Sequence, residues 1–473
     1  MNKQLVWFRN DLRVRDNPAL VAAMSAGPTV ACFALAIDQW REHDVGDARI
    51  AFILRTLREL AGQLDTLGIP LRFLDAPRFA DAPREITALA KQIGAARVLF
   101  NAEYPLNERK RDSRVILALQ ALGENGGESV EVDVFDGSVV RTPGTVLTAT
   151  QTPYTVYSPF CKRWLGGIEA HLGLLPVPKR QTQPASSVDA DTVPNRLGGV
   201  GEALFADEWP GGESAALARL DQFCASAVSD YADHRDLPIE PGTSSLSPYL
   251  SIGAISPHRC FDALGITSEA DFWAAEDGSQ VWARELIWRE FYRHLTALFP
   301  HISQGQNFKR SMHDIPWRDD QGDFAAWCNG QTGYPLVDAA MRQLNSMGWM
   351  HNRLRMVSAM FLTKHLLIDW RWGEKYFMQQ LIDGDFAANN GGWQWSASTG
   401  SDAAPYFRIF NPIMQAKKFD SQAKFIQRYV PELRGLAAKA VFEPWKVDGH
   451  DYVAPIVEHK FARQRALDAF SVG

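Results

Sequence analysis

The sequence has few cysteines and no long apolar run. Its five cysteines are scattered, odd in number and without CxxC spacing: Cys32, Cys161, Cys224, Cys260 and Cys328. This pattern argues against a disulfide framework and against a zinc site. No window approaches the roughly 18 consecutive apolar residues of a membrane span, and the start, MNKQLVWFRNDLRVRD, turns polar too soon for a signal peptide. We therefore expect a cytoplasmic protein without a membrane partner.

An excess of positive charge is also missing. The net charge of −6 excludes a global footprint for nucleic acid. Locally, residues 284–310 carry five Lys/Arg against two acids, and Trp282 and Trp288 stand in the same region. Basic residues beside flat rings suit a nucleic-acid groove with a stacking platform. On charge alone, a solvated helix face is the better explanation.

The first 130 or so residues lack a GxGxxG motif after their first apolar run, so a Rossmann dinucleotide site is not indicated. They do alternate apolar runs with amphipathic stretches. Residues 4–8, 29–37, 70–75 and 96–102 are typical of buried parallel strands, and residues 47–68 and 83–94 of helices ending on glycine. The pattern predicts a doubly wound α/β domain with a parallel sheet.

The remainder of the chain changes character twice. Residues 132–205 are rich in Pro, Gly and Ser, as expected of a long inter-domain linker. From residue 206 onward helical periodicity takes over, in segments 212–236, 279–299, 334–348 and 354–373. We predict three parts: an α/β domain over 1–131, the linker, and an all-α domain over 206–473.

The most unusual stretch runs from Trp349 to Pro412. Five tryptophans stand there among arginines, aspartates, asparagines and glycines. Polar groups interleaved with large rings suit a pocket for a flat, polar-edged ligand. In NNGGWQW, two glycines beside an amide pair predict backbone that takes φ > 0 or approaches something closely. A Trp-rich core beneath a solvated loop is the alternative.

The longer motifs identify a resemblance that runs essentially end to end. They are VWFRNDLRVRDNPAL, TSSLSPYLSIGAISP, ELIWREFYRHL, TGYPLVDAAMRQLNSMGWMHNRLRM, DGDFAANNGGWQWSASTGSDAAPYFRIFNP and PIVEHKFARQRAL. The chain resembles the photolyase/cryptochrome family, and most closely the bacterial class I cyclobutane pyrimidine dimer photolyases. The resemblance implies an α/β antenna domain linked to a helical domain that binds flavin adenine dinucleotide (FAD).

The resemblance also implies which residues hold the flavin. The residues matching the phosphate and ribitol positions are Tyr231, Thr243, Ser244, Ser245, Leu246 and Ser247. Those matching positions along the flavin are Trp282, Glu285, Arg289, Trp349, Asn352, Arg355, Asp383, Asp385 and Asn389. The family often has Arg at Ser245, so one phosphate-directed charge is missing here. Asn389 would face flavin N5 and favour the anionic reduced form. Asp383 and Asp385 have no third ligand at useful spacing, so we expect no metal.

Substrate contacts follow from the same resemblance. Glu285, Trp288, Asn352 and Met356 match the pocket for the dimer, and Arg235, Trp288, Arg353 and Arg408 match DNA contacts, with Lys417 and Lys418 as further candidates. A dimer stacks and pairs poorly, so flipping it out costs less than flipping a normal base, a few kcal/mol. Stacking on an aromatic ring returns roughly 1–3 kcal/mol per base.

Two further sets match the family. Trp393, Trp370 and Trp317 match its tryptophan electron-transfer chain, which reduces oxidised flavin, and His43, Asn107 and Glu108 match positions that bind a methenyltetrahydrofolate antenna. Ser303 and Gln304 stand where Cys and Lys would help hold the folate. Deazaflavin or an empty antenna site are therefore the alternatives.

The resemblance implies repair of cyclobutane dimers in damaged DNA by electron transfer from light-excited reduced FAD, without net redox change. One alternative is a (6-4) photoproduct photolyase, but Asn352 and Met356 stand where that enzyme has two histidines. A blue-light-sensing cryptochrome, or a DASH-type cryptochrome that prefers single strands, are the others. Asn389 favours repair. No feature indicates an oligomer, so we expect a monomer.

Overall fold

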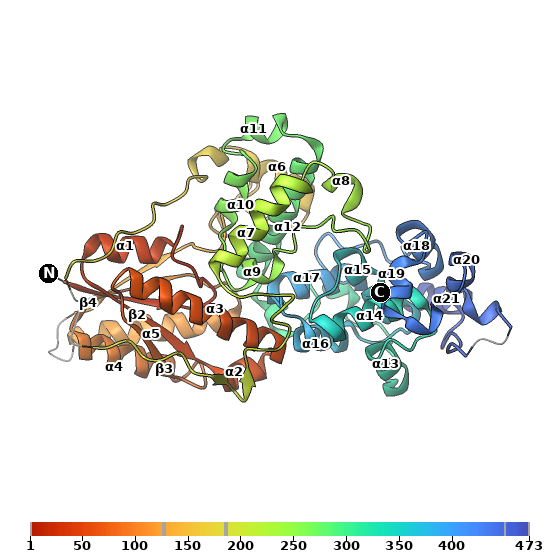
Figure 1. Cartoon of the computed structure of the whole chain (residues 1–473), viewed down its shortest axis with the longest axis horizontal. Helices are drawn as coiled ribbons and strands as arrows, with labels where there is room; N and C mark the ends of the chain where they lie inside the picture. Colours follow the sequence, from red (N-terminus) through yellow and green to blue (C-terminus); the bar gives the residue numbers. More distant parts are fainter. Residues whose placement is uncertain (1, 125–128, 184–187, 449–450, 472–473) are drawn as a thin grey trace. The chain divides into compact units, whose positions relative to one another are not determined.

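The structure of the chain, a computed structural model, describes residues 2–124, 129–183, 188–448 and 451–471 (Figure 1). It divides into two compact units. The first contains residues 1–154, 158–229 and 244–300, and the second contains residues 155–157, 230–243 and 301–473.

The first unit contains a parallel five-stranded sheet of order β3-β2-β1-β4-β5. Its strands are β1 (Lys3–Phe8), β2 (Thr29–Leu35), β3 (Leu71–Asp75), β4 (Ala95–Asn101) and β5 (Glu131–Phe135). Leu5 pairs with Val30 on β2 and with Val98 on β4, and all three are fully buried. A strand buried on both faces must be apolar throughout, which explains why β1 reads as a continuous apolar run. The four strands predicted from the sequence are confirmed.

Helices α1 (Pro18–Ala26), α3 (Asp47–Thr66), α4 (Ala82–Ile93) and α5 (Leu106–Glu124) pack around this sheet, and α2 (Ile37–Glu42) follows β2 (Figure 1). The α4 helix ends on Gly94, whose φ of 66° is the left-handed conformation expected of a terminating glycine. The doubly wound α/β architecture is therefore confirmed.

The predicted domain limits differ from the two units. The limit at residue 131 falls on the first residue of β5, an edge strand that sequence periodicity did not reveal. The predicted linker contains α6 (Tyr157–Leu165) and the short pair β6 (Arg196–Leu197) and β7 (Val200–Gly201). Helices α7 (Glu213–Ser226), α9 (Ser247–Ser251), α10 (Pro257–Ala263), α11 (Glu269–Ala274) and α12 (Asp277–Leu298) group with the sheet. One reason is the edge contact between Phe52 on α3 and Tyr249 on α9, with ring centroids 5.2 Å apart.

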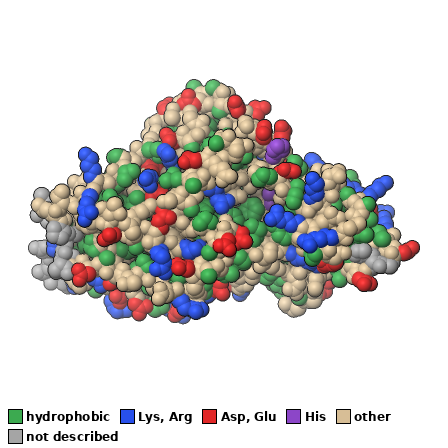
Figure 2. All heavy atoms as spheres, viewed as in Figure 1, with side chains coloured by type: hydrophobic (Ala, Val, Ile, Leu, Met, Phe, Trp, Pro, Cys, Tyr) green, Lys and Arg blue, Asp and Glu red, His purple; other side chains and the backbone are tan. Residues whose placement is uncertain are grey.

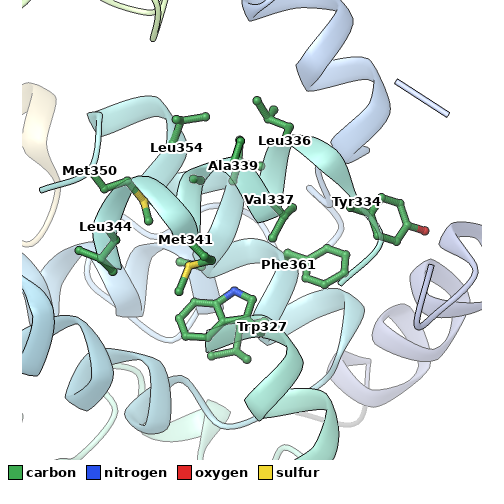
Figure 3. Packing of buried hydrophobic residues seen from close by; sticks show 14 of the residues in the cluster. Trp327, Tyr334, Leu336, Val337, Ala339, Met341, Leu344, Met350, Leu354 and Phe361 are labelled. Atoms are coloured by element: carbon green, nitrogen blue, oxygen red, sulfur yellow. The ribbon is translucent and has the colours of Figure 1, made fainter. Parts of the chain in front are cut away.

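The second unit is helical. Its helices are α8 (Tyr231–His234), α13 (Gln321–Cys328), α14 (Pro335–Met347), α15 (Asn352–Met360), α16 (Trp370–Gln380), α17 (Phe386–Ala397), α18 (Pro412–Phe419), α19 (Lys424–Tyr429), α20 (Ala438–Val441) and α21 (His459–Phe470). In its core, one buried hydrophobic cluster contains Trp327, Phe361, and Val337 and Met341 of α14 (Figure 3). The α14 helix is buried nearly all round, as its apolar sequence predicted.

Two predicted helices are wrong in extent. Segment 212–236 breaks between α7 and α8, and segment 354–373 breaks after a π-helical turn, Phe361–His365. Leu367 takes φ of 54°, and its carbonyl accepts a hydrogen bond from the Arg318 backbone N–H at 2.7 Å. Asp369 then caps α16 by accepting from the Arg371 N–H. Apolar periodicity alone would continue the helix through this segment. The hydrogen bond from a distant part of the chain and the local cap end it instead.

The glycine prediction for NNGGWQW is also wrong in its first part. Gly391 and Gly392 lie inside α17 and have no positive φ. A Cβ at Gly392 would meet no protein atom within 4 Å, so the helix leaves open space beside this residue. A glycine inside a helix costs about 1 kcal/mol relative to alanine.

Candidate functional site

The second unit builds a polar site around the start of α15 and the loop before α17. Arg355 donates to Asp383 Oδ2 at 2.7 Å and to the carbonyl of Met350 at 2.8 Å. Asp383 is buried, and its Oδ1 has no hydrogen-bond partner in the described part of the chain. A buried carboxylate oxygen without a donor is costly, so this atom points to a missing donor. Sequence analysis predicted both residues here.

Asp385 and Asn389 lie on the first turns of α17. Asp385 is the N-cap and accepts from the Ala388 N–H at 3.0 Å. This capping role by itself explains an aspartate at this position. The Asn389 amide donates to the carbonyl of Glu374 on α16 at 2.9 Å. Its neighbour Asn390 donates to the Glu374 carboxylate at 2.7 Å. Packing against α16 therefore orients the amide pair.

The three predicted electron-transfer tryptophans share one core. Trp393 and Trp370 are buried in the same cluster, and Trp317 packs against it. Trp370 donates from Nε1 to Asn307 Oδ1 at 2.9 Å, and Trp317 lies edge-on to Phe470 at 5.7 Å. Trp393 Nε1 is buried and has no partner among the described residues. It is therefore a second orphaned polar atom near α17.

Basic candidates for DNA contact lie in different surroundings. Arg353 pairs with Asp236 at 2.6 Å and stacks 4.6 Å from the Phe419 ring, whereas Arg408 is exposed. Arg235 stands 5.4 Å from the Tyr231 ring, and Lys417 pairs with Glu443 at 3.4 Å. Figure 2 shows Lys and Arg side chains gathered over the region of α18 and α19. Part of this charge is neutralised by ion pairs.

In the first unit, the predicted residues of α12 lie three or four positions apart and so share a face. Trp282 is buried against Phe223, with centroids 4.9 Å apart, while Glu285 and Trp288 are half-buried. Arg289 donates to the carbonyls of Ser138 at 2.7 Å and Leu250 at 3.1 Å. Arg289 therefore has a structural role whatever else it binds.

The loop predicted to hold phosphate precedes α9. Ser245 takes φ of 50°, a left-handed conformation that is uncommon outside glycine, and Leu246 returns to the right-handed region. Successive residues of opposite hand turn their N–H groups to one side, which makes an anion-binding concavity. Thr243 is the last residue of segment 230–243 of the second unit, and Ser244 to Ser247 belong to the first unit.

The predicted antenna residues lie together in the first unit. His43 stands 3.6 Å from Glu108 through Nδ1, and its Nε2 lies 3.0 Å from Asn107 Nδ2. Burial and the neighbouring Glu103 carboxylate raise the pKa of Glu108 to about 7. Burial also lowers the pKa of His43. Ser303 and Gln304 lie in the 3-10 turn Pro300–Gln304.

Sequence reasoning missed a buried charge network at the carboxyl ends of β1 and β4, where the strand order reverses. Arg9 pairs with Asp112 at 3.1 Å, and Arg111 pairs with Glu103 at 2.6 Å. Both guanidinium groups stack on Trp7, at 4.4 and 4.8 Å. Burial would raise the pKa of Glu103, but the two arginines lower it to about 2. Charged residues directly after an apolar strand were the available signal.

The described residues contain no group of three or more His, Cys, Asp or Glu able to hold a metal ion. Among the same residues, no helix is long and apolar enough to span a bilayer.

Comparison with known proteins gives full-length matches. Residues 4–181 match the family described as DNA photolyase, and residues 282–472 match the FAD binding domain of DNA photolyase. The chain is 44% identical over 478 residues to deoxyribodipyrimidine photo-lyase from Salmonella typhimurium, covering 99% of this chain and 98% of the relative.

Solved structures agree with these matches. The chain matches a bacterial class III photolyase from Agrobacterium tumefaciens with a TM-score of 0.86 at 36% identity, over 100% of this chain and 97% of that one. It also matches a Synechocystis cryptochrome with a TM-score of 0.86 at 27% identity, over 99% of each chain.

Proposed function

The chain belongs to the DNA photolyase family, and from this premise we propose that it repairs cyclobutane pyrimidine dimers in DNA with light. The 44% identity to a deoxyribodipyrimidine photo-lyase over 99% of this chain supports the reaction, and the FAD-binding match supports the cofactor. The reduced cofactor would supply the light-excited electron that splits the cyclobutane ring. The protein's task is to hold cofactor and dimer, exclude water and tune the surroundings electrostatically.

The residues present fit FAD. The observation that carries this assignment is the buried Asp383, which is paired with Arg355 through Oδ2 and has no partner at Oδ1. The flavin ring edge carries amide-like donors and acceptors that suit this arrangement. Trp349, Asn352, Asp385 and Asn389 would line the ring, and the open space beside Gly392 allows close approach to α17.

The remaining cofactor assignments follow from the family match. The phosphates and ribitol would bind Tyr231 and the loop from Thr243 to Ser247. This loop supplies hydroxyl groups and the N–H groups of its left-handed turn. The α12 residues assigned to the flavin are Trp282, Glu285 and Arg289. The class I placement stays a prediction.

The dimer would contact Glu285 and Trp288 on α12 and Asn352 and Met356 on α15. Trp288 offers a flat wall, and Glu285 can hydrogen-bond a thymine edge and stabilise charge arriving on it. Within each pair the residues lie three or four positions apart, so each helix presents them on one face.

A (6-4) photoproduct photolyase is less well supported. The nearby histidine, His351, is buried, caps α15 by accepting from the Arg353 N–H at 3.2 Å, and has a pKa lowered to about 4 by burial. A histidine that is neutral and engaged as a cap is a poor proton donor to a lesion. The asparagine at 389 likewise favours repair over a sensor.

We infer a folate antenna at His43, Asn107 and Glu108, because a carboxylic acid with a pKa near 7 beside a neutral imidazole can exchange hydrogen bonds with a pterin amide edge. The alternatives are a deazaflavin at this site and a site that holds no antenna. We also infer that DNA contacts involve Arg235, Arg353 and Arg408, and that the protein acts as a cytoplasmic monomer.

The test is light-dependent loss of cyclobutane dimers from ultraviolet-irradiated DNA by the purified, flavin-reduced protein, with a dark control. Loss under light alone supports the proposal. Persistence of the dimers in the light, with FAD bound and reduced, would refute it, and (6-4) lesions would then be assayed with the same preparation.

A further inference from the structure

The side chain of Trp393 contacts an aromatic ladder that the predicted electron-transfer chain does not use. Its ring centroid lies 6.0 Å from that of Trp327, at an interplanar angle of 73°. Phe377 lies 4.9 Å from Trp393 and stacks on Trp327 at 5.9 Å and 13°. Trp327 is fully buried, and its Nε1 donates to the carbonyl of Ser358 at 3.1 Å.

The ladder continues from Trp327 to a half-buried tyrosine. The Tyr376 ring lies 5.7 Å from Trp327 at 63°. Its hydroxyl lies 2.8 Å from Asn345 Oδ1 and 3.1 Å from the carbonyl of Cys328, both of which are acceptors. A second contact, through Phe324, reaches Trp372 at 5.2 Å. Phenylalanine is not readily oxidised, so Tyr376 is the oxidisable end of the direct ladder.

The surroundings of Trp370 differ from those of Trp327. The guanidinium of Arg371 stands 4.8 Å above the Trp370 ring. A positive charge there disfavours a cation radical on that indole, and the ion pair of Arg371 with Asp369 at 2.9 Å offsets only part of the effect. Trp327 instead lies between the neutral rings of Phe324 and Phe377.

We propose that Trp327 and Tyr376 form a second electron-supply branch to Trp393. This inference rests on the proposed function and on the predicted electron-transfer chain, in which Trp393 would stand next to FAD and reduce it in the light. With oxidised FAD bound and excited by light, Trp393 would supply one electron to it, and Trp327 would then give one electron to the Trp393 cation radical. Tyr376 then reduces Trp327 and releases its phenolic proton to water. A thiol reductant in solution returns a hydrogen atom to the tyrosyl radical.

Loss of the phenolic proton keeps the oxidising equivalent on Tyr376. Burial and the nearby Cys328 raise the pKa of Tyr376 to about 12, so the phenol is protonated at rest. The neutral tyrosyl radical left after proton loss reoxidises the indole poorly. The branch therefore predicts a long-lived tyrosyl radical as well as reduced flavin.

The experiment uses the full FAD-loaded chain with oxidised flavin under illumination. Flavin absorption, recorded with the thiol present, gives the photoreduction rate, and electron paramagnetic resonance, recorded without the thiol, detects the tyrosyl radical. We expect Trp370→Phe to retain part of the photoreduction and to show the radical. Adding Trp327→Phe should abolish that remainder, and adding Tyr376→Phe should abolish the radical. Trp445→Phe, which changes a half-buried tryptophan outside the ladder, is the control and should change neither readout.

The branch is overturned if Trp370→Phe shows no tyrosyl radical, or if adding Trp327→Phe leaves the residual rate unchanged. Tyr376→Phe removes only a hydroxyl, so it keeps the test decisive if a Trp327 variant folds poorly. Trp393→Phe separates the two levels of inference. If this variant photoreduces like the wild type, the placement of Trp393 beside FAD fails. If it is inactive while the Trp327 and Tyr376 variants behave like the wild type, the branch alone fails.

Discussion

The ring of Trp393 lies where a side chain at Gly373 would begin. A Cβ at Gly373 would lie 2.1 Å from Trp393 Cη2, far inside van der Waals contact. This glycine on α16 lets α17 bring Trp393 onto the helix that also carries Trp370. It therefore connects two of the predicted electron-transfer residues through a purely steric requirement.

Gly373→Ala should displace the Trp393 ring. Overpacking of this kind costs about 1–3 kcal/mol, so the free energy of unfolding in urea should fall by that amount. Light-driven reduction of oxidised flavin should also slow. Gly62→Ala on α3 is the control, because its Cβ would meet nothing within 4 Å. That variant should gain up to about 1 kcal/mol from helix propensity. Equal stability of the Gly373 variant and the wild type would contradict the steric role.

Asp383→Asn keeps the shape of the side chain and removes its charge, leaving Arg355 uncompensated. We expect loss of FAD on gel filtration and a decrease of about 1–3 kcal/mol in the free energy of unfolding, as for a lost hydrogen bond between charged groups. Asp323→Asn breaks the ion pair with Arg318, whose atoms are 2.9 Å apart, and serves as the control. It should cost stability without releasing FAD. Full FAD occupancy in the Asp383 variant would count against the assigned site.

Trp288→Ala should weaken binding of dimer-containing DNA by about 1–3 kcal/mol, the range measured for loss of base stacking on an aromatic ring. Affinity for undamaged DNA should change little, because phosphate contacts remain. Fluorescence anisotropy with matched damaged and undamaged duplexes measures both. Trp273→Ala, which removes an exposed tryptophan on α11, is the control and should leave both affinities unchanged. An identical loss in the two Trp variants would remove Trp288 from the dimer pocket.

Arg408→Ala should reduce the salt dependence of DNA binding. Each phosphate contact contributes about 0.9 to the slope of log K against log salt on duplex DNA, so the slope should become shallower by roughly that amount. Binding constants measured from low to moderate salt give the slope directly. Lys91→Ala on α4, an exposed basic residue of the α/β unit, should leave it unchanged. An unaltered slope in the Arg408 variant would exclude a phosphate contact there.

Stability should fall in acid through His365. Nε2 of His365 lies 2.9 Å from Nδ1 of His459. Burial and this neighbouring histidine lower the pKa of His365 to about 3. Between pH about 6.5 and about 3, the unfolded chain binds a proton that the folded chain does not. The free energy of unfolding therefore falls as the pH drops through this window, and this histidine alone contributes about 2 kcal/mol at pH 5.

His365→Gln should make that pH dependence shallower, because up to one proton fewer is taken up on unfolding. Denaturant titrations between pH 7 and pH 5 measure the change. His313→Gln replaces an exposed histidine and should leave the dependence as in the wild type. An unchanged slope in the His365 variant would mean that this histidine is not neutral in the folded chain.

Local sequence patterns predicted the elements well and their ends less well. Strands β1 to β4 and helices α3, α4, α12 and α14 follow from apolar spacing and terminating residues. Strand β5 was missed because it lies at the edge of the sheet and none of its residues is buried, so it lacks the continuous apolar run of β1. Sequence patterns did not predict the break before α16, because it depends on Arg318, a residue distant in sequence that pairs with the loop backbone.

The site shows the same division. Motif order in the sequence determined the family, and with it came the predictions of the flavin, dimer and tryptophan residues, because those residue types carry the chemistry. Only the tertiary structure decided which groups face each other: that Asp383 pairs with Arg355, and that Trp393 contacts Trp327 as well as sharing a core with Trp370. Sequence periodicity reports which face of a helix is apolar. The neighbour of a given ring depends on how three helices pack, and that depends on contacts between residues distant along the chain.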